Sequence, residues 1–460
     1  MPNDTNKLKA LASYNGGIAE AITPGTIEER VEPPFILNKK GNVENDTRNA
    51  VIFVKYCLPD SIRYNTFSNQ IEICGSVPWD KGRAKIRGWT DTDTCNALMY
   101  ANDYGLKNKQ NLEDAICIYA NRNTYHPIME YLEALPYQGD GYIKRLAVEY
   151  MGCEDSEYTY EVMKLLLLAM VQRVYHPGCK FDYVAIFVGN QGTYKSSFWR
   201  TLARDDSWFT DSVDSFGDRK KLGELIQGKW LVELGEMSAF RKSEIESIKA
   251  AITTQVDSYR EAYGKHRSDY NRTAIFVGTT NNKTFLKDST GNRRFLVLPI
   301  DETKRTKDLF KSKTRDEDFD GALAEALHIF KESTKDGNLI PLILPKSVWA
   351  EAQERQNNAN AYEEWTGLIE AWLDDEVARA GKKYTAAIDV WCNCFNKDKG
   401  TYTNREAYRI NQILDALPHW ERSGSVKIIR RSNEGYKFFD YHGRGYRYVI
   451  SDDVPNTIPY

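Results

Sequence analysis

A lysine and a serine follow a glycine-containing loop in GNQGTYKSS, residues 189–197. The backbone N–H groups of such a loop, with the N-terminus of a following helix, can surround a phosphate group. A lysine at this position reaches the outer phosphates of a nucleotide, and a serine hydroxyl binds Mg²⁺. The residues predicted to contact the nucleotide are Gly189, Asn190, Gln191, Gly192, Thr193, Tyr194, Lys195, Ser196 and Ser197.

Tyr194 stands where the usual G-x-x-x-x-G-K-[ST] pattern has glycine. If the loop needs a positive φ there, tyrosine costs about 1 kcal/mol or more, because its Cβ crowds the backbone. If the loop needs only a helical φ, with Cβ pointing away from the phosphates, tyrosine is tolerated. A strand–turn–helix that matches the pattern by chance is the alternative.

Two glutamates lie at the end of the apolar stretch KWLVELGEM, residues 229–237. A carboxylate at a strand end beside a phosphate loop can hold Mg²⁺, and another can orient an attacking water. Glu233 and Glu236 are three positions apart, so within one straight strand they would face opposite sides. We expect only one to point at the nucleotide unless the strand ends between them. A solvent-exposed acidic strand edge is the alternative.

A second apolar stretch, FVGTTNN at 276–282, also ends in polar residues. The amide of Asn281 could polarise a water or sense a γ-phosphate, although a polar turn that caps a strand has the same composition. Arg293 and Arg294 follow shortly afterwards. Next to a nucleotide site, an arginine can stabilise transition-state charge from a neighbouring subunit, whereas two arginines in a turn are otherwise solvated.

A basic hairpin is predicted between these stretches, within DSYREAYGKHRSDYNRT at 257–273. Lysine and arginine at its tip suit phosphates, and a tyrosine can stack on a base. The predicted nucleic-acid contacts are Tyr263, Lys265, His266 and Arg267. An exposed hairpin without a ligand is the alternative.

Strands and helices alternate around these residues. Apolar stretches predict strands at 183–188, 229–235 and 273–280, and a helix is expected at 243–253. This alternation is typical of an α/β layer with a parallel sheet. Asp46 is also predicted to cap a helix that begins at the next residue, although VIFV in that segment leaves a strand possible.

The whole chain has room for roughly three domains of about 150 residues. Shifts in composition divide its 460 residues into a flexible tail (1–35), a mainly helical domain (36–150), the α/β domain (151–345) and a C-terminal α+β domain (346–460). In the last of these, TNREAYRINQILDALPHW predicts a helix, and a hairpin dense in Arg and Lys follows. A winged-helix DNA-binding domain, with Arg430 and Arg431 as DNA contacts, is one interpretation; a small closing subdomain is the other.

Charge and composition restrict the possible functions. The net charge of −3 supplies no global positive field, so any nucleic-acid binding must come from local basic patches. The eight cysteines are scattered, and this spacing favours reduced thiols over a zinc site. No secretory signal is visible, and the longest apolar run is far shorter than the roughly 20 residues that span a bilayer. We therefore expect a cytoplasmic protein.

Taken in order, GNQGTYKSSF, KWLVELGEM, SIKAAITTQVDSYREAYGK, FVGTTNN and STGNRRF resemble the virulence-associated protein E family, phage and pathogenicity-island proteins related to superfamily III helicases. The resemblance covers the region from about residue 100 to about residue 300. It implies an AAA+-like P-loop ATPase core that uses ATP and Mg²⁺ and assembles into a ring, most often a hexamer, around DNA.

The resemblance also implies roles for single residues. Lys195 and Ser196 match the phosphate-loop pair, with Ser196 and Glu233 as Mg²⁺ ligands; Glu233 and Glu236 match the acidic Walker B positions, and Asn281 matches the sensor asparagine. Arg293 and Arg294 fill the place of the arginine finger, and the region of Lys265 matches the hairpin that tracks DNA. Two departures are Tyr194, where relatives have glycine, and the two residues that separate the glutamates.

These observations predict an ATP-dependent DNA helicase that replicates a phage or mobile genetic element, with DNA, further copies of the chain, and a primase or initiator as partners. A replication-initiation ring that binds ATP and DNA without unwinding is the alternative, and Tyr194 favours it. A small-molecule P-loop kinase explains neither the TTNN and TGNRRF stretches nor the basic C-terminal hairpin.

Overall fold

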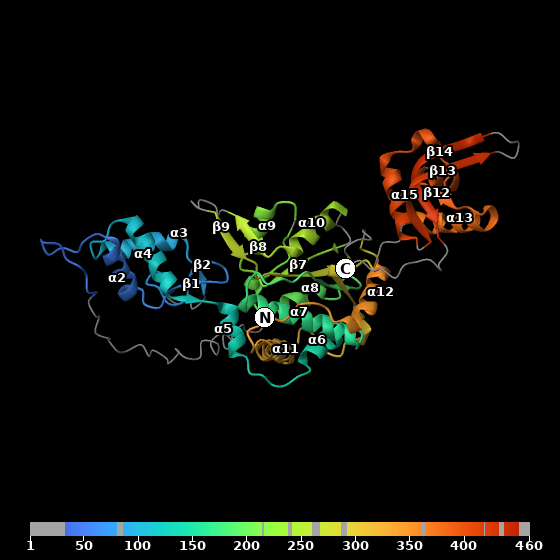
Figure 1. Ribbon diagram of the computed structural model, residues 1–460. Helices are drawn as coiled ribbons and strands as arrows, with labels where there is room; N and C mark the ends of the chain where they lie inside the picture. The colour runs from blue at the N-terminus through green and yellow to red at the C-terminus, as the bar shows by residue number, and fades with distance from the viewer. Residues whose placement is uncertain are drawn as a thin grey trace. The chain divides into compact units, whose positions relative to one another are not determined.

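The computed structural model describes residues 33–80, 86–213, 216–237, 242–259, 267–286, 292–359, 364–417, 419–431 and 437–449 (Figure 1). The chain divides into two compact units. The larger unit holds Met1–Lys283 and Gly291–Asn358, and the smaller holds Thr284–Thr290 and Ala359–Tyr460. Among the described helices, none has the length and hydropathy needed to cross a membrane.

A five-stranded parallel sheet forms the centre of the larger unit. Its strands, in spatial order, are β11 (Phe295–Pro299), β5 (Val184–Val188), β10 (Ile275–Thr280), β7 (Leu231–Leu234) and β6 (Phe209–Thr210). The strands are apolar along almost their whole length because both faces of the sheet are buried. The predicted α/β layer with a parallel sheet is therefore confirmed. All five strands run in the same direction, so their carboxyl ends share one edge.

Helices cover both faces of this sheet. Figure 1 shows α6 (Tyr142–Met151), α7 (Glu157–Tyr175) and α11 (Ser312–Ser333) on one side, and α9 (Arg219–Ile226) and α10 (Lys242–Thr253) toward the other. Around its middle, α7 is buried on all sides, as its apolar run predicts, and it ends just before a Pro-Gly pair. Each fully buried Leu, Val or Phe of this core contributes about 1.5–3 kcal/mol. Further helices are α5 (Pro127–Ala134), α8 (Lys195–Leu202) and α12 (Trp349–Ala359).

The first part of the larger unit has its own apolar cluster, built on three helices and a small sheet. The helices are α2 (Thr47–Cys57), α3 (Asp91–Asn102) and α4 (Lys109–Arg122). Asp46 caps α2 as predicted, accepting from the backbone N–H of Asn49 at 3.0 Å. The four-stranded sheet has the order β3 (Arg87–Gly88), β2 (Gln70–Ile73), β1 (Ile62–Asn65) and β4 (Thr124–Tyr125), and strands this short carry too few residues to show alternation in the sequence.

The smaller unit combines helices with an antiparallel sheet. In chain order it contains α13 (Glu364–Ala380), β12 (Tyr384–Thr385), α14 (Ala387–Asp389) running into a π-helical turn (Val390–Cys394), α15 (Asn404–Ala416), β13 (Trp420–Arg431) and β14 (Lys437–Tyr448). The strand order is β12-β14-β13. The predicted helix and the predicted hairpin after it are both present.

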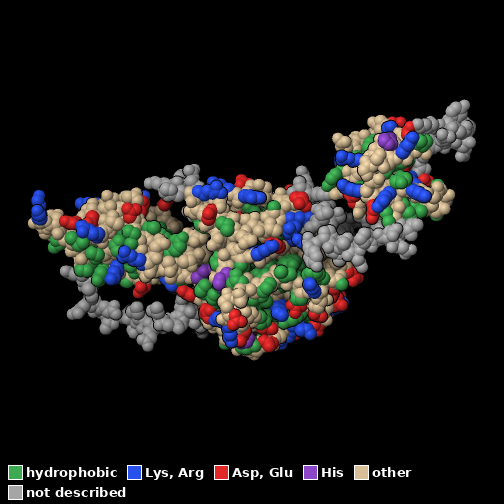
Figure 2. Space-filling view, in the orientation of Figure 1, with side chains coloured by type: hydrophobic (Ala, Val, Ile, Leu, Met, Phe, Trp, Pro, Cys, Tyr) green, Lys and Arg blue, Asp and Glu red, His purple; other side chains and the backbone are tan. Residues whose placement is uncertain are grey.

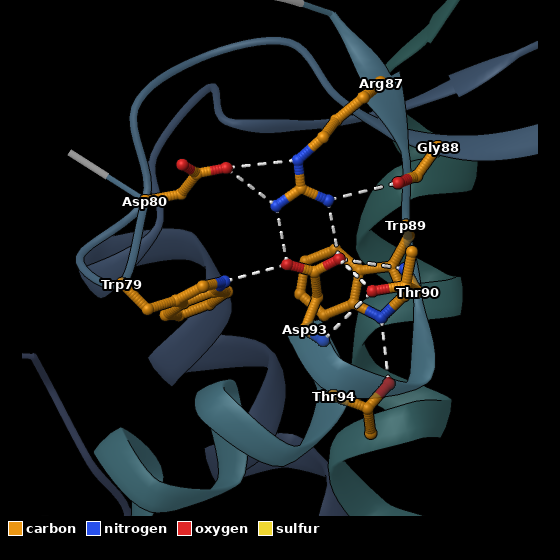
Figure 3. A network of polar contacts seen from close by, with 8 residues as sticks. All are labelled: Trp79, Asp80, Arg87, Gly88, Trp89, Thr90, Asp93 and Thr94. Atoms are coloured by element: carbon orange, nitrogen blue, oxygen red, sulfur yellow. Dashed lines mark hydrogen bonds and ion pairs between the residues drawn. The ribbon is translucent and has the colours of Figure 1, made fainter. Parts of the chain in front are cut away.

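A polar network around Arg87 fixes the start of α3 (Figure 3). The guanidinium of Arg87 contacts both carboxylate oxygens of Asp93 at 2.7 Å and also reaches Asp80. Thr90 and Asp93 form a reciprocal capping box at the start of the helix. Burial alone raises the pKa of Asp93, but hydrogen bonds from Arg87, Thr90 and Trp79 outweigh it and hold the pKa well below its usual range.

This network predicts a pH-dependent contribution to stability. Because the folded-state pKa of Asp93 is depressed, the contribution is complete above the unfolded pKa of about 4 and is lost as the pH falls through the folded value. We expect Asp93→Asn to lower the free energy of unfolding at pH 7 by about 2 kcal/mol. This is less than the roughly 3–5 kcal/mol for breaking a fully buried pair, because Arg87 is partly exposed. Denaturant unfolding at pH 7 and at pH 3 measures it, with the exposed Asp91→Asn as control. A difference between wild type and variant that is equally large at both pH values would contradict this account.

Candidate nucleotide-binding site

The loop of residues 189–194 joins β5 to α8 at the carboxyl edge of the parallel sheet. Lys195 is the first residue of α8, and its side chain folds back over the loop. Its Nζ donates to the carbonyl oxygens of Asn190 at 2.7 Å and Gly189 at 2.9 Å, and to Oδ1 of Asn281 at 2.8 Å. Lys195 is only 7% exposed, and burial lowers its pKa. The structure thus brings the predicted lysine and the predicted sensor amide into direct contact.

Glu233 lies in β7 and points at the same edge. Its Oε1 accepts from the hydroxyls of Ser196 and Thr279, each at 2.6 Å. Its Oε2 is buried and has no hydrogen-bond partner among the described residues. Burial raises the pKa of this carboxyl, although both hydroxyls act to lower it. A buried carboxylate oxygen without a donor, next to a serine hydroxyl, fits the oxygen ligands that Mg²⁺ takes.

Glu236 also reaches this edge, because β7 ends at Leu234 and the chain turns there. The backbone of Glu236 has φ 48°, and its Oε1 accepts from Nδ2 of Asn281 at 3.1 Å. The condition under which both glutamates could face the site is therefore met. Asn281 joins two of the predicted residues, because its amide contacts Lys195 with one atom and Glu236 with the other.

Tyr194 adopts the left-handed conformation, with φ 58° and ψ 27°. The loop therefore needs a positive φ at this position, and a side chain there costs about 1–2 kcal/mol. The ring is half exposed and rests edge-on against Phe310, with 4.8 Å between ring centroids. Tyrosine is thus tolerated because its ring lies against another ring instead of within the loop.

Tyr194→Gly is expected to tighten ATP binding about fivefold with little change in stability. Glycine relieves the left-handed strain and lets the loop backbone come closer to a phosphate. The substitution also removes the contact with Phe310 and gives the unfolded chain more conformational freedom. The two effects lower the free energy of unfolding by about as much as the relief of the left-handed strain raises it. Calorimetric titration with ATP measures the affinity. Phe310→Ala, which removes the ring contact but keeps the backbone angle, is the matched control; unchanged affinity in Tyr194→Gly would mean that the side chain does not limit access.

Arg305 belongs to the same site although the motifs in the sequence do not indicate it. Its Nη2 donates to the carbonyl of Thr193, 112 positions earlier in the chain. In a trans peptide the C=O and the next N–H point in opposite directions, so holding this carbonyl turns the N–H of Tyr194 the other way. Nε of Arg305 is buried without a partner within the described part of the chain. Only the folded chain could reveal this contact, because no local pattern marks a lone arginine.

Arg293 and Arg294 lie at the other edge of the sheet. They precede β11, whose first residue pairs with Val184 and whose last pairs with Val188. Five strand residues at about 3.3 Å each separate them from the level of the phosphate loop, a distance of about 16 Å. Neither arginine can therefore reach the loop of its own chain. Arg293 is exposed, and Arg294 is partly buried.

The predicted nucleic-acid contacts are described only in part. The hairpin is confirmed by the antiparallel pairing of β8 (Val256–Tyr259) with β9 (Ser268–Asn271), and a buried ion pair of Arg272 with Asp257 holds its base. Arg267 is exposed beside it. Outside the described residues lie Tyr263, Lys265 and His266, together with the side chains of Arg430 and Arg431.

The family model of the virulence-associated protein E-like domain matches residues 132–361, half of the chain. The chain belongs to the virulence-associated protein E family. The matched region contains the loop, both glutamates, Asn281, Arg305 and the two arginines before β11, and it ends where the smaller unit continues. The expected resemblance is confirmed.

Solved structures of the NrS-1 C-terminal region are also similar to this family member. The apo structure of residues 305–718 is 12% identical with a TM-score of 0.46, covering 87% of this chain and 99% of that one. The A form of the same region is 12% identical with a TM-score of 0.45, covering 88% and 100%. None of the curated proteins matches this chain.

Proposed function

We propose that this protein is an ATP-dependent DNA helicase, a ring translocase of the superfamily III kind, that serves replication of a phage or mobile genetic element. One observation carries the proposal: three neighbouring strand ends bring Lys195, Glu233 and Asn281 together around the phosphate loop. Membership of the virulence-associated protein E family supports the same assignment.

The strand order supports an AAA+-like core. The strand that leads into the loop, β5, lies between β11 and β10. Asn281, the sensor-type asparagine, directly follows β10, and β7, which contains Glu233, lies next to β10. Functional side chains at the carboxyl ends of parallel strands are the general arrangement for ligand binding in open α/β sheets.

Each residue of the site has a role that its contacts allow. Lys195 would neutralise the β- and γ-phosphates of ATP, and Asn281 would hydrogen-bond the γ-phosphate or the attacking water. Ser196 and Glu233 would hold Mg²⁺, which when bound neutralises charge on the phosphates. Glu236, exposed at the end of β7, would orient the water.

The position of Arg293 and Arg294 supports a ring in which each copy acts on its neighbour. Because they lie at the far edge of the sheet, they can act only on the site of a neighbouring copy. A head-to-tail interface that closes on itself produces such a ring, and a hexamer is the size we propose. We propose that the hairpin formed by β8 and β9 contacts DNA in the pore, with the Arg272–Asp257 pair holding its base.

The alternative is a ring that binds ATP and DNA at an origin without unwinding. Tyr194 favours it, because a side chain in the left-handed position of the loop hinders close approach of a phosphate. Both proposals share the nucleotide site and differ in turnover.

Two measurements on the full chain test the proposal. The first is ATP turnover with and without single-stranded DNA, and the second is separation of the strands of a forked duplex. We expect DNA to increase turnover and the fork to be separated in an ATP-dependent way. ATP binding without turnover or separation would favour the alternative. Failure to bind ATP in the presence of Mg²⁺ would overturn both.

A further inference from the structure

The helix α15 presents two chemically different faces. Its apolar residues Ile410, Ile413, Leu414 and Leu417 are buried in the core of the smaller unit. Successive residues of a helix are rotated by about 100° around its axis. By this geometry, four polar residues lie within roughly 100° of one another on the side opposite the apolar residues: Asn404, Arg405, Tyr408 and Gln412. The fold of this unit therefore leaves a polar stripe on the surface.

The side chains of this stripe suit the edges of base pairs. Arginine binds guanine with two hydrogen bonds, and asparagine or glutamine binds adenine in the same way. Tyr408 is 58% exposed, and its hydroxyl accepts from Nε2 of Gln412 at 3.1 Å. Exposure to solvent alone does not explain a tyrosine ring that is held on the surface by a hydrogen bond from an amide.

The hairpin that follows α15 adds positive charge. Lys427 of β13 and Arg444 of β14 are both exposed. Val426 and Ile428 are buried on the other face of the hairpin. Two nearby acids are already neutralised, since Glu421 pairs with Arg447 and Asp415 pairs with Arg422. Figure 2 shows Lys and Arg side chains spread over the visible face of this unit.

The shape of the stripe indicates which nucleic acid fits. An α-helix with its side chains is about 10–12 Å across and enters the major groove of duplex DNA, which is about 12 Å wide. Single strands are instead bound in grooves lined with stacking rings. The order helix, strand, helix, helix and two-stranded hairpin places α15 in the position of the second helix of a helix-turn-helix.

We propose that α15 is a recognition helix for a specific duplex DNA sequence. Asn404, Arg405 and Gln412 contact base edges in the major groove, while Lys427 and Arg444 contact the phosphates. This deepens the proposed function by supplying a site of duplex recognition separate from the ATPase core. Duplex recognition by α15 requires neither the nucleotide site nor the DNA-tracking hairpin of the larger unit.

Selection of duplexes from a random-sequence pool by the full chain, without nucleotide, tests the proposal. We expect one sequence to be enriched, and Arg405→Ala to weaken binding to it about tenfold while relaxing the preference at one base pair. Lys427→Ala is expected to weaken binding to all duplexes alike and to reduce the salt dependence by about one phosphate contact. Arg379→Ala, in an exposed pair on α13, is the matched control and should bind like the wild type.

Two further outcomes decide the matter. Lys195→Ala should bind the selected duplex as tightly as the wild type, so a loss of ATP turnover leaves this proposal intact, and a loss of duplex preference leaves the ATPase proposal intact. No enriched duplex sequence, or an Arg405→Ala protein that binds the selected duplex like the Arg379→Ala control, would overturn it. Thermal unfolding of each variant establishes that the exposed substitutions leave the fold unchanged.

Discussion

Lys195→Ala is expected to reduce ATP turnover at least about 100-fold, the effect of removing one preorganised cation from a site of charge development. The ammonium group of Lys195 is buried, and burial strengthens its interaction with a phosphate because little water screens it. Its Nζ also lies between the loop carbonyls and Asn281. Steady-state ATP turnover in the presence of single-stranded DNA is the measurement.

Two controls separate the role of this charge from a general loss of structure. Lys220→Ala removes an exposed lysine of α9 that pairs with Glu224, and it should leave turnover unchanged. Lys195→Arg keeps the charge but not the compact shape of the ammonium, so it should recover only a small part of the activity. Turnover in Lys195→Ala close to that of the wild type would mean that this loop does not bind the reacting phosphates.

Local patterns in the sequence were sufficient to predict the phosphate loop, the strand before it and the helix after it. Lys195, Ser196 and the apolar stretch before them form one short segment, and their types alone predict the strand, loop and helix. The orientation of the two glutamates depends on where β7 ends. The sequence allowed either a straight strand through both glutamates or a strand that ends between them. The fold resolves this because Leu234 is the last strand residue and the chain turns with a positive φ at Glu236.

Contacts between distant segments could not be predicted in this way. Arg305 reaches the loop only because β11 pairs with β5 and carries the following segment to the same edge. The same pairing places Arg293 at the opposite edge of the sheet, and the number of residues between Lys195 and Arg293 does not predict this position. From the sequence alone, position 194 could have had either a positive or a helical φ. The structure shows that Tyr194 has the positive, left-handed φ.

Loss of the arginine that we propose to act on a neighbouring copy is expected to reduce ATP turnover most. An arginine in this role contributes about 10³-fold or more to turnover in other phosphoryl-transfer enzymes. Arg293 is the more exposed of the pair, so we expect Arg293→Ala to lose turnover to this extent and Arg294→Ala to lose less. Neither variant should lose ATP affinity in proportion, because neither arginine reaches its own loop.

Mixing two inactive variants tests whether the arginine acts between copies. In a ring that contains Lys195→Ala and Arg293→Ala subunits in equal number, about one site in four combines an intact loop with an intact arginine from the next subunit. We expect turnover to recover to about that fraction of the wild-type rate. An arginine that acted on its own chain would leave every site in the mixture incomplete, and no activity would return. Recovery would therefore show that Arg293 of one copy acts at the phosphate loop of another copy.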